Sequence, residues 1–256
     1  MYRLLLWLVL LLPVVATARP PAIMLASPWP DPAPAAVADL LVSEKLDGVR
    51  ARWDGQRLWS RGGQPIALPP GFADGWPAQP LDGELWLGRG RFDDTSALVR
   101  TRRHDDRRWE QLQFWVFDLP AEPGRFEQRL ARLEHLLQRH PSAHLRLVPQ
   151  QRHADHAALQ AHLARVLAAG GEGLIAHHRH ARYQPGRSAL LFKLKPWHDA
   201  EATVLAHQAG RGKYQGQLGA LLVIADDGAR FAIGSGLSDA QRRQPPPVGS
   251  RISYRY

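Results

Sequence analysis

The sequence predicts an α+β protein that ends in a small all-β domain. Two segments, 125–140 and 154–169, repeat apolar residues at helical spacing with charged residues between them, so each is expected to form an amphipathic helix. Short apolar strand patterns precede and separate these helices. Between residues 201 and 233 only strand patterns occur, and Asp226-Asp227-Gly228 is expected to form a hairpin turn there.

The N-terminal stretch has the pattern of an export signal. Arg3 supplies a positive charge, residues 4–15 are largely apolar, and a small-residue cleavage site ends at Ala18, so we expect export to the periplasm and cleavage there. The absence of cysteine suits that oxidising compartment. The expected organisation is a signal peptide at 1–18, a Pro/Ala-rich linker at 19–36, a first domain at 37–197 and a second domain at 198–256.

Net charge indicates the class of partner. The chain has 256 residues and a formal charge of +9, and its sequence pI is near 10.5. Such a chain attracts polyanions, which include nucleic acid, nucleotides and anionic membrane surfaces. No long amphipathic basic helix is evident, so no stable membrane association is expected once the signal is removed.

The segment from Glu44 to Arg50 combines a lysine with a cation that can bind phosphate. Lys45 is followed by Asp47-Gly48 and then by Arg50, and apolar residues on both sides predict two short strands joined by a turn. A lysine amine is a nucleophile only when deprotonated, which burial or a neighbouring cation favours. Lys45 is therefore a candidate nucleophile, and a surface hairpin with a solvated lysine is the alternative.

Charged side chains also interrupt later apolar strands. Glu84 is a candidate for binding a ribose hydroxyl or a metal, with a structural salt bridge as the alternative because unpaired buried charge is costly. Glu172 is a further acidic residue, at the start of a glycine-led strand. Lys193 and Lys195 share one face of a strand, where an anion such as phosphate would relieve their repulsion. Arg61, beside a glycine turn, is either a surface residue or a further phosphate ligand.

Aromatic and histidine residues carry weaker signals. Phe117 lies in the aromatic strand pattern 113–119 and either packs in the core or stacks on a base. His177, His178 and His180 do not form a convincing metal site, since successive strand residues face opposite ways.

Taken in order, these motifs resemble the covalent nucleotidyltransferase superfamily of ATP-dependent ligases and capping enzymes. Residues 45–50 are similar to its first motif, 82–84 to its third, 114–119 to the aromatic strand that follows, 172–175 to its fourth and 193–195 to its fifth. The resemblance implies an adenylation (nucleotidyltransferase, ATP-grasp-like) domain of antiparallel sheets with flanking helices, followed by an OB-fold. The small exported ATP-dependent DNA ligases of bacteria are the most similar group, because this chain shares their signal peptide, segment 183–188 and second-domain opening at 210–222.

The resemblance also implies a reaction and roles for individual residues. Lys45 would take AMP from ATP, the AMP would pass to the 5′-phosphate of a nick in duplex DNA, and the 3′-hydroxyl would displace it; in-line displacement at phosphorus depends mainly on positioning and charge. Neighbouring cations are expected to keep the Lys45 amine partly neutral. The implied roles are nucleotide binding by Glu44, Arg50, Arg61, Glu84, Phe117, Lys193 and Lys195, binding of Mg²⁺ or Mn²⁺ by Glu172, and DNA binding by Arg211 and Lys213.

Two departures from the family pattern leave alternatives open. First, His177 stands at the position where the family pattern has Arg or Lys. Second, the family pattern continues beyond the position of Tyr256 into a last strand that carries an arginine-containing sixth motif, so the second domain is expected to lack this strand. The alternatives are an RNA ligase or guanylyltransferase of the same superfamily, or an inactive nucleic-acid-binding remnant. We expect a monomer without an obligate protein partner.

Overall fold

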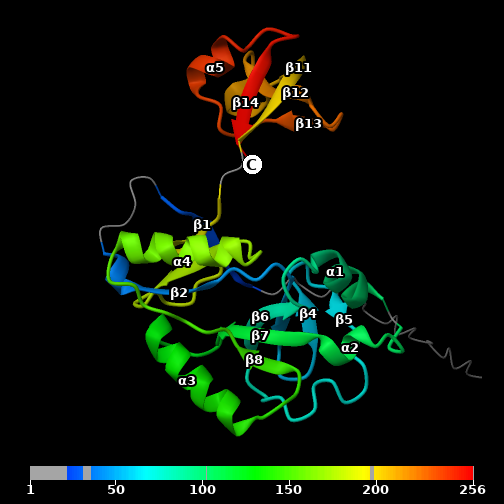
Figure 1. The fold of residues 1–256 in the computed structure, drawn as a ribbon, viewed down its shortest axis with the longest axis vertical. Coiled ribbons are helices and arrows are strands. Elements are labelled where there is room, and N and C mark those ends of the chain that lie inside the picture. The colour runs from blue at the N-terminus through cyan, green and yellow to red at the C-terminus, as the bar shows by residue number, and fades with distance from the viewer. Residues whose placement is uncertain (1–21, 31–35, 102, 197–198, 256) are drawn as a thin grey trace, which may run out of the picture. The chain divides into compact units, whose positions relative to one another are not determined.

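The computed structural model describes residues 22–30, 36–101, 103–196 and 199–255, and the signal segment predicted at 1–18 lies outside them. The chain divides into two compact units, one ending at Lys195 and the other beginning at Pro196, and each is described by itself (Figure 1). No helix in the described ranges is long and apolar enough to cross a membrane.

The first unit contains two sheets and four α-helices in its described part. Its elements, in chain order, are β1 (Met24–Pro28), η1 (Val37–Asp39), β2 (Leu40–Glu44), β3 (Val49–Trp53), β4 (Leu58–Ser60), β5 (Pro65–Ile66), β6 (Leu81–Trp86), α1 (Phe92–Arg100), α2 (Arg108–Gln111), β7 (Gln113–Asp118), α3 (Phe126–Arg139), β8 (Leu145–Leu147), α4 (His156–Ala168), β9 (Leu174–His178) and β10 (Gly186–Leu194).

Most strand pairs in these sheets are antiparallel. The six-stranded sheet has the order β5-β4-β3-β6-β7-β8, and the four-stranded sheet has the order β1-β10-β9-β2. Only β1 with β10 and β7 with β8 pair in parallel within the described strands. The prediction of an α+β domain with antiparallel sheets and flanking helices is confirmed.

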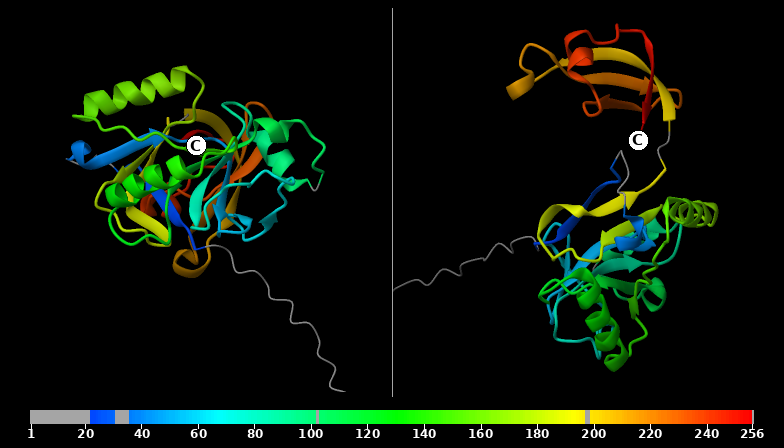
Figure 2. Two further views of the ribbon diagram at one scale, coloured as in Figure 1. Left: turned by 90° about the horizontal axis from the view of Figure 1, so that it is seen from below. Right: turned by 90° about the vertical axis from the view of Figure 1, so that its left-hand side faces the viewer.

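Helices α3 and α4 lie on opposite faces of the four-stranded sheet (Figures 1 and 2). Leu159 and Val166 of α4 pack with Val42 of β2, whereas Phe126 and Leu130 of α3 pack against the neighbouring Leu41. Alternate residues of a strand face opposite sides, which explains how one strand serves both helices. The other side of α3 packs on the six-stranded sheet, so this helix fills the space between the two sheets.

The predicted linker at 19–36 is wrong over part of its length. Met24–Pro28 forms β1, which pairs with β10, and Met24 is buried with Ala181 and Leu191. Proline suggested an extended linker, but proline also occurs in edge strands, and β1 is an edge strand of its sheet. The fold therefore begins before residue 37.

The polar segment 91–108 also contains structure that its charge pattern concealed. It forms α1 and the start of α2, which bury Leu98 and Trp109 in the core of the six-stranded sheet. Its charged side chains remain at the surface, where Arg108 pairs with both Asp94 and Asp106.

The second unit contains one antiparallel sheet with the order β13-β12-β11-β14, one short α-helix and one 3₁₀ helix in its described part. Its core is formed by residues such as Val204, Leu221 and Val223. The strands predicted between 201 and 233 are confirmed, and Arg251–Arg255 forms a further strand, β14. The expected lack of a last strand concerns positions after Tyr256 and stays a prediction. The elements are β11 (Asp199–Ala209), η2 (Gly212–Tyr214), β12 (Leu218–Ala225), β13 (Arg230–Ile233), α5 (Asp239–Arg243) and β14 (Arg251–Arg255).

Candidate active site

Lys45 lies just after β2, where the chain passes from one sheet to the other. The strands on either side of it, β2 and β3, do not pair; they belong to the four-stranded and six-stranded sheets, so the predicted strands form but no hairpin does. Gly48 makes this crossing possible, because a Cβ atom there would lie 2.2 Å from the carbonyl oxygen of Leu85. The backbone N–H of Lys45 donates to the carbonyl of Gly173 at 2.9 Å. The crossing therefore holds Lys45 beside the residue that follows Glu172.

Gly173 is required at this junction for a similar reason. Its φ is +150°, and a Cβ atom there would lie 2.2 Å from the carbonyl oxygen of Leu194. A larger residue would push β9 away from β10 and move Glu172 with it. The glycine in this motif thus fixes the position of the neighbouring carboxylate.

A cavity of about 390 Å³ opens between the two sheets at this point. It collects every candidate site residue predicted in the first unit: Glu44, Lys45, Arg50, Arg61, Glu84, Phe117, Glu172, Lys193 and Lys195. The other two candidates, Arg211 and Lys213, belong to the second unit.

Lys45 is paired with a carboxylate rather than surrounded by cations. Its ammonium donates to Oε2 of Glu172, and the two side chains are 26% and 29% exposed. Burial raises the pKa of the nearby Asp47 carboxyl; repulsion from Glu172 raises it further, and Lys45 lowers it. The ion pair of Lys45 is thus with a carboxylate, which sequence order alone could not reveal, although cations such as Lys193 and Lys195 line the same cavity.

Arg50 is held by Asp82 and by the backbone of β1. Its Nε and Nη2 atoms donate to the two carboxylate oxygens of Asp82, each at 2.8 Å, and Nη2 also donates to the carbonyl of Met24 at 3.1 Å. The guanidinium carbon lies 4.7 Å from the centroid of the Phe117 ring. Arg50 is therefore fixed beside the Phe117 ring, and among the described residues its Nη1 atom has no hydrogen-bond partner.

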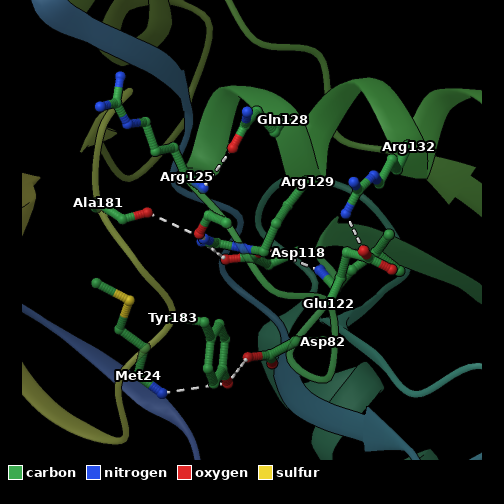
Figure 3. Close-up of polar contacts among 12 residues, drawn as sticks. Met24, Asp82, Asp118, Glu122, Arg125, Gln128, Arg129, Arg132, Ala181 and Tyr183 are labelled. Carbon is green, nitrogen blue, oxygen red and sulfur yellow. Dashed lines mark hydrogen bonds and ion pairs between the residues drawn. The ribbon is translucent and has the colours of Figure 1, made fainter.

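Tyr183 completes this network and had no assigned role in the sequence (Figure 3). Its hydroxyl donates to Oδ2 of Asp82 at 2.6 Å and accepts from the backbone N–H of Met24 at 3.2 Å. Because its proton is held by Asp82 in a buried place, the pKa of Tyr183 is raised well above its usual value. Tyr183 therefore ties Asp82, and through it Arg50, to the edge strand β1.

Glu84 is a half-buried carboxyl opposite Arg50 in the β3–β6 register. Burial raises its pKa to about 8, although Arg50 and Lys45 pull the pKa down. At neutral pH this carboxyl is largely protonated, so it can donate a hydrogen bond as well as accept one.

Four cations that line the cavity have no carboxylate partner within the described residues: Arg61, Arg187, Lys193 and Lys195. Lysine is rare in this chain and concentrated at the site. The sequence has 33 basic residues, counting lysine and arginine together, of which four are lysines, and three of those four line this cavity. Arginine supplies nearly all surface positive charge in this chain, so the lysines stand out as selected for the site. Such unpaired cations are suited to binding phosphate groups.

Comparison with known proteins agrees with this geometry. Residues 24–195 match the ATP dependent DNA ligase domain, and residues 209–256 match the DNA ligase OB-like domain. The chain belongs to the ATP-dependent DNA ligase family. A DNA ligase from Haemophilus influenzae is 38% identical over 216 residues, covering 84% of this chain and 80% of that protein.

Solved structures show the same relationship for this ligase fold. A Lig E DNA ligase, studied for DNA binding with a minimal scaffold, superposes with a TM-score of 0.78 at 40% identity and covers 92% of both chains. The Chlorella virus DNA ligase-adenylate has a TM-score of 0.58 at 23% identity, covering 93% of this chain and 95% of that chain, and so supports the fold alone. The predicted fold class and ligase activity are confirmed.

Glu44 has a different partner from the nucleotide predicted for it. Its two carboxylate oxygens accept from Nε and Nη2 of Arg89 at 2.7 and 2.8 Å, and Nη1 of Arg89 donates to the carbonyl of Ala169 at 3.2 Å. Arg89 thus fastens the residue before Lys45 to the end of α4. No sequence signal identified Arg89, because its partners are 45 and 80 residues away.

The buried pair of Asp118 and Arg129 also went unrecognised in the sequence (Figure 3). Nε and Nη2 of Arg129 donate to the two Asp118 oxygens at 2.7 and 2.9 Å, and Nη1 donates to the carbonyls of Gly124 and Ala181 at 2.9 Å. Arg129 lies on the amphipathic helix α3, where an arginine at this spacing is indistinguishable from a solvated one. It joins β7, α3 and the segment before β10 behind the cavity.

The histidines of β9 do not form a metal site, and in the described ranges no group of three or more His, Cys, Asp or Glu residues is arranged to hold a metal ion. His177 is instead a buried cavity residue whose ring stacks on Phe126 with centroids 3.7 Å apart. Burial, with a smaller effect of Arg129, lowers its pKa well below the usual value. The imidazole is therefore neutral at pH 7 and does not supply the positive charge that the family resemblance led us to expect at this position.

Arg211 and Lys213 are exposed on the second unit. The ammonium of Lys213 lies 4.7 Å from the centroid of the Tyr214 ring, and the guanidinium carbon of the buried Arg242 lies 4.0 Å from the same centroid. Arg242 in turn donates to the carbonyls of Leu218, Gly219 and Gly234. The basic turn is thus supported from beneath by an anchored ring.

Proposed function

We propose that Lys45 is the nucleophile with which this ligase takes AMP from ATP. The amine nitrogen forms a bond to the α-phosphorus while the bond from that phosphorus to the bridging oxygen breaks, and pyrophosphate leaves. The observation that carries this proposal is the convergence of Lys45 on one cavity with the predicted cations Arg50, Arg61, Lys193 and Lys195 and the predicted carboxyl groups of Glu84 and Glu172. Such an arrangement places positive charge where in-line displacement at phosphorus needs it.

The remaining residues have roles that their surroundings support. Lys193, Lys195 and Arg61 would neutralise phosphate charge, since they lack protein partners in the described chain. Glu84 would hydrogen-bond the ribose, and Phe117 would stack on the base through the ring face that Arg50 leaves open. Arg50 itself reaches a ligand only through Nη1.

The same cavity then serves nick sealing. AMP passes from Lys45 to the 5′-phosphate of a nick, and the 3′-hydroxyl attacks that phosphate and releases AMP. Arg211 and Lys213 would contact the DNA backbone, which explains acceptance of any sequence and predicts sensitivity to salt. The protein would act as an exported, periplasmic monomer after cleavage at Ala18, which sequencing of the N-terminus of the exported protein would test.

Glu172 is the residue that would hold a divalent cation. The donor set fits Mg²⁺ or Mn²⁺, because one carboxylate together with substrate phosphates is how such ions are usually held, and Asp47 adds negative charge nearby. The ion would neutralise charge on the phosphates of ATP. Occupation of Glu172 by another cation would also remove the partner of Lys45 and release its amine.

Intact-mass spectrometry of residues 19–256 after incubation with ATP and Mg²⁺ tests this proposal. We expect a gain of one AMP, no gain in Lys45→Ala, and an unchanged gain in the matched control Lys213→Ala. Lys45→Ala should still seal a nick that already carries 5′-linked AMP, because that step does not need the amine. AMP on another residue, or none on any, would contradict the assignment of Lys45.

A further inference from the structure

A second ion pair begins one residue before Lys45. Nε and Nη2 of Arg89 donate to the two carboxylate oxygens of Glu44, and Nη1 of Arg89 donates to the carbonyl of Ala169. Glu44 immediately precedes Lys45, and Ala169 lies three residues before Glu172. One guanidinium therefore holds both of the segments that carry the ion pair of Lys45 and Glu172.

The same two segments also contact each other. Gly171, the residue before Glu172, lies so close to Glu44 that a Cβ atom there would be 2.9 Å from Oε1 of Glu44 and 2.5 Å from a methyl carbon of Val166. Only glycine, which has no Cβ atom, allows this approach. The carboxylate of Glu44 thus packs on the backbone that leads into Glu172, and Arg89 fixes the orientation of that carboxylate.

Arg89 itself lies in a loop that follows the other sheet. It comes three residues after β6 of the six-stranded sheet, whereas Glu44 ends β2 of the four-stranded sheet. A second cavity, of about 150 Å³, is lined by the side chains of both ion pairs. Glu44, Lys45 and Glu172 also line the main cavity, but Arg89 is not among the described residues that do so. Arg89 is therefore placed to hold the pair of Lys45 and Glu172 without contacting a ligand in the main cavity.

The exposure of this second ion pair determines what it can contribute. The side chains of Arg89 and Glu44 are 37% and 21% exposed, and an ion pair this accessible stabilises a fold only slightly. Its bidentate geometry nevertheless fixes the relative orientation of the two partners. Displacing a reacting group by about 1 Å slows a reaction by about 100-fold. Arg89 should therefore affect the rate of reaction and leave the stability of the fold unchanged.

We infer that Arg89 is a positioning residue for the reaction of Lys45. It acts through Glu44 and the backbone of Ala169, and it keeps the Lys45 amine and the Glu172 carboxylate in the geometry that the reaction needs. This inference rests on the proposed role of Lys45 as the nucleophile. Without Arg89 the two segments are free to move apart, so bond formation slows while ATP still binds in the main cavity.

Single-turnover formation of lysyl-AMP, followed by intact mass over a series of ATP concentrations, tests this inference. In Arg89→Gln we expect the maximal rate to fall about 10- to 100-fold and the ATP concentration at half-maximal rate to change less than about twofold. The midpoint of urea denaturation should remain that of the parent. Arg89→Lys should recover part of the rate, because an ammonium can still contact Glu44 but cannot make two parallel hydrogen bonds.

The matched control is Arg91→Gln, in the same loop. Arg91 pairs with Asp94 and not with the residues around Lys45, so this variant should react at the parent rate. Glu44→Gln should slow the reaction as Arg89→Gln does. The double variant Glu44→Gln/Arg89→Gln should be no slower than Arg89→Gln alone, since both changes remove the same contact. Effects that multiply in the double variant would contradict the inference.

Other results would assign Arg89 a different role and overturn the inference. Weakened affinity for ATP in Arg89→Gln would identify Arg89 as a nucleotide ligand. A loss confined to the sealing of nicks that already carry 5′-linked AMP would identify it as a DNA contact. An adduct on Lys45 that forms at the parent rate in Arg89→Gln would contradict only the positioning role, whereas absence of an adduct on Lys45 in the parent would overturn both this inference and the proposed function.

Discussion

Two ion pairs in the first unit have opposite environments. Asp118 and Arg129 are 4% and 0% exposed, and Arg129 makes four hydrogen bonds to fixed protein oxygens. Lys45 and Glu172 are 29% exposed or less but open to the cavity, and a single contact joins their side chains. In the first pair, the saturated pair, all three guanidinium nitrogens and both carboxylate oxygens are bonded to protein atoms, so it cannot exchange partners without loss of structure. Each side chain of the second pair can instead leave its partner and bind a ligand. The difference separates charge that stabilises the fold from charge that is available for chemistry.

The largest effect on stability should follow from breaking the saturated pair. Arg129→Met leaves the Asp118 carboxylate buried without its ion-pair partner, so the free energy of unfolding should fall by about 3–5 kcal/mol. Urea denaturation followed by tryptophan fluorescence measures this unit, because eight of the nine tryptophans precede Pro196. Arg132→Met is the control: its partner Glu122 is on the surface, and the change should be below about 1 kcal/mol. Equal losses of unfolding free energy in the two variants would show that the buried pair of Asp118 and Arg129 stabilises the fold no more than a surface pair does.

Glu172→Gln should have the opposite effect: a small change in stability and a large loss of adenylation rate. Its ion pair with Lys45 is partly exposed at the cavity, so stability should change by less than about 1 kcal/mol. Adenylation should slow by about 100-fold or more, because the site loses both the charge that positions Lys45 and its predicted metal ligand. Single-turnover formation of lysyl-AMP measures this, with Glu122→Gln as a surface control. Loss of stability without loss of rate would show that Glu172 is structural.

Glu84 should make the stability of the first unit depend on pH. Its pKa rises from an ordinary 4.5 to about 8 on folding, so the folded protein holds a proton that the unfolded chain has lost. This contribution to stability is present in full below pH 4.5 and is lost as pH rises through 8. We expect the parent to lose about 1–2 kcal/mol relative to Glu84→Gln between pH 5 and 8, measured by urea denaturation at several pH values. A constant difference between the two proteins would contradict this.

Tyr183→Phe should have the smallest effect. It removes the hydrogen bonds to Asp82 and to the backbone of Met24, which costs about 1 kcal/mol of stability. Because Asp82 keeps its two contacts with Arg50, the apparent affinity for ATP should weaken only a few-fold. Calorimetry of ATP binding to Tyr183→Phe and to the control Tyr214→Phe in the second unit measures this. A loss of unfolding free energy as large as that of Arg129→Met would contradict this and show that Tyr183 stabilises the fold as strongly as the buried ion pair does.

The sequence by itself determined the local elements and the membership of the site. The spacing of apolar residues placed α3 and α4, strand alternation placed Lys193 with Lys195, and the order of charged motifs collected nine residues that do line one cavity. The helices and the strand alternation are readable because they depend on neighbours only a few positions apart, whereas the nine site residues were brought together by the resemblance of their motifs to a known family.

Only the tertiary structure decided which charges meet. Lys45 and Glu172 are 127 residues apart, Glu44 and Arg89 are 45 apart, and Asp82 and Tyr183 are 101 apart. The assignment of 19–36 to a linker failed in the same way, since β1 exists only because β10 supplies its hydrogen bonds. Pairings of this kind follow from packing two sheets around a shared cavity, and no local pattern records them.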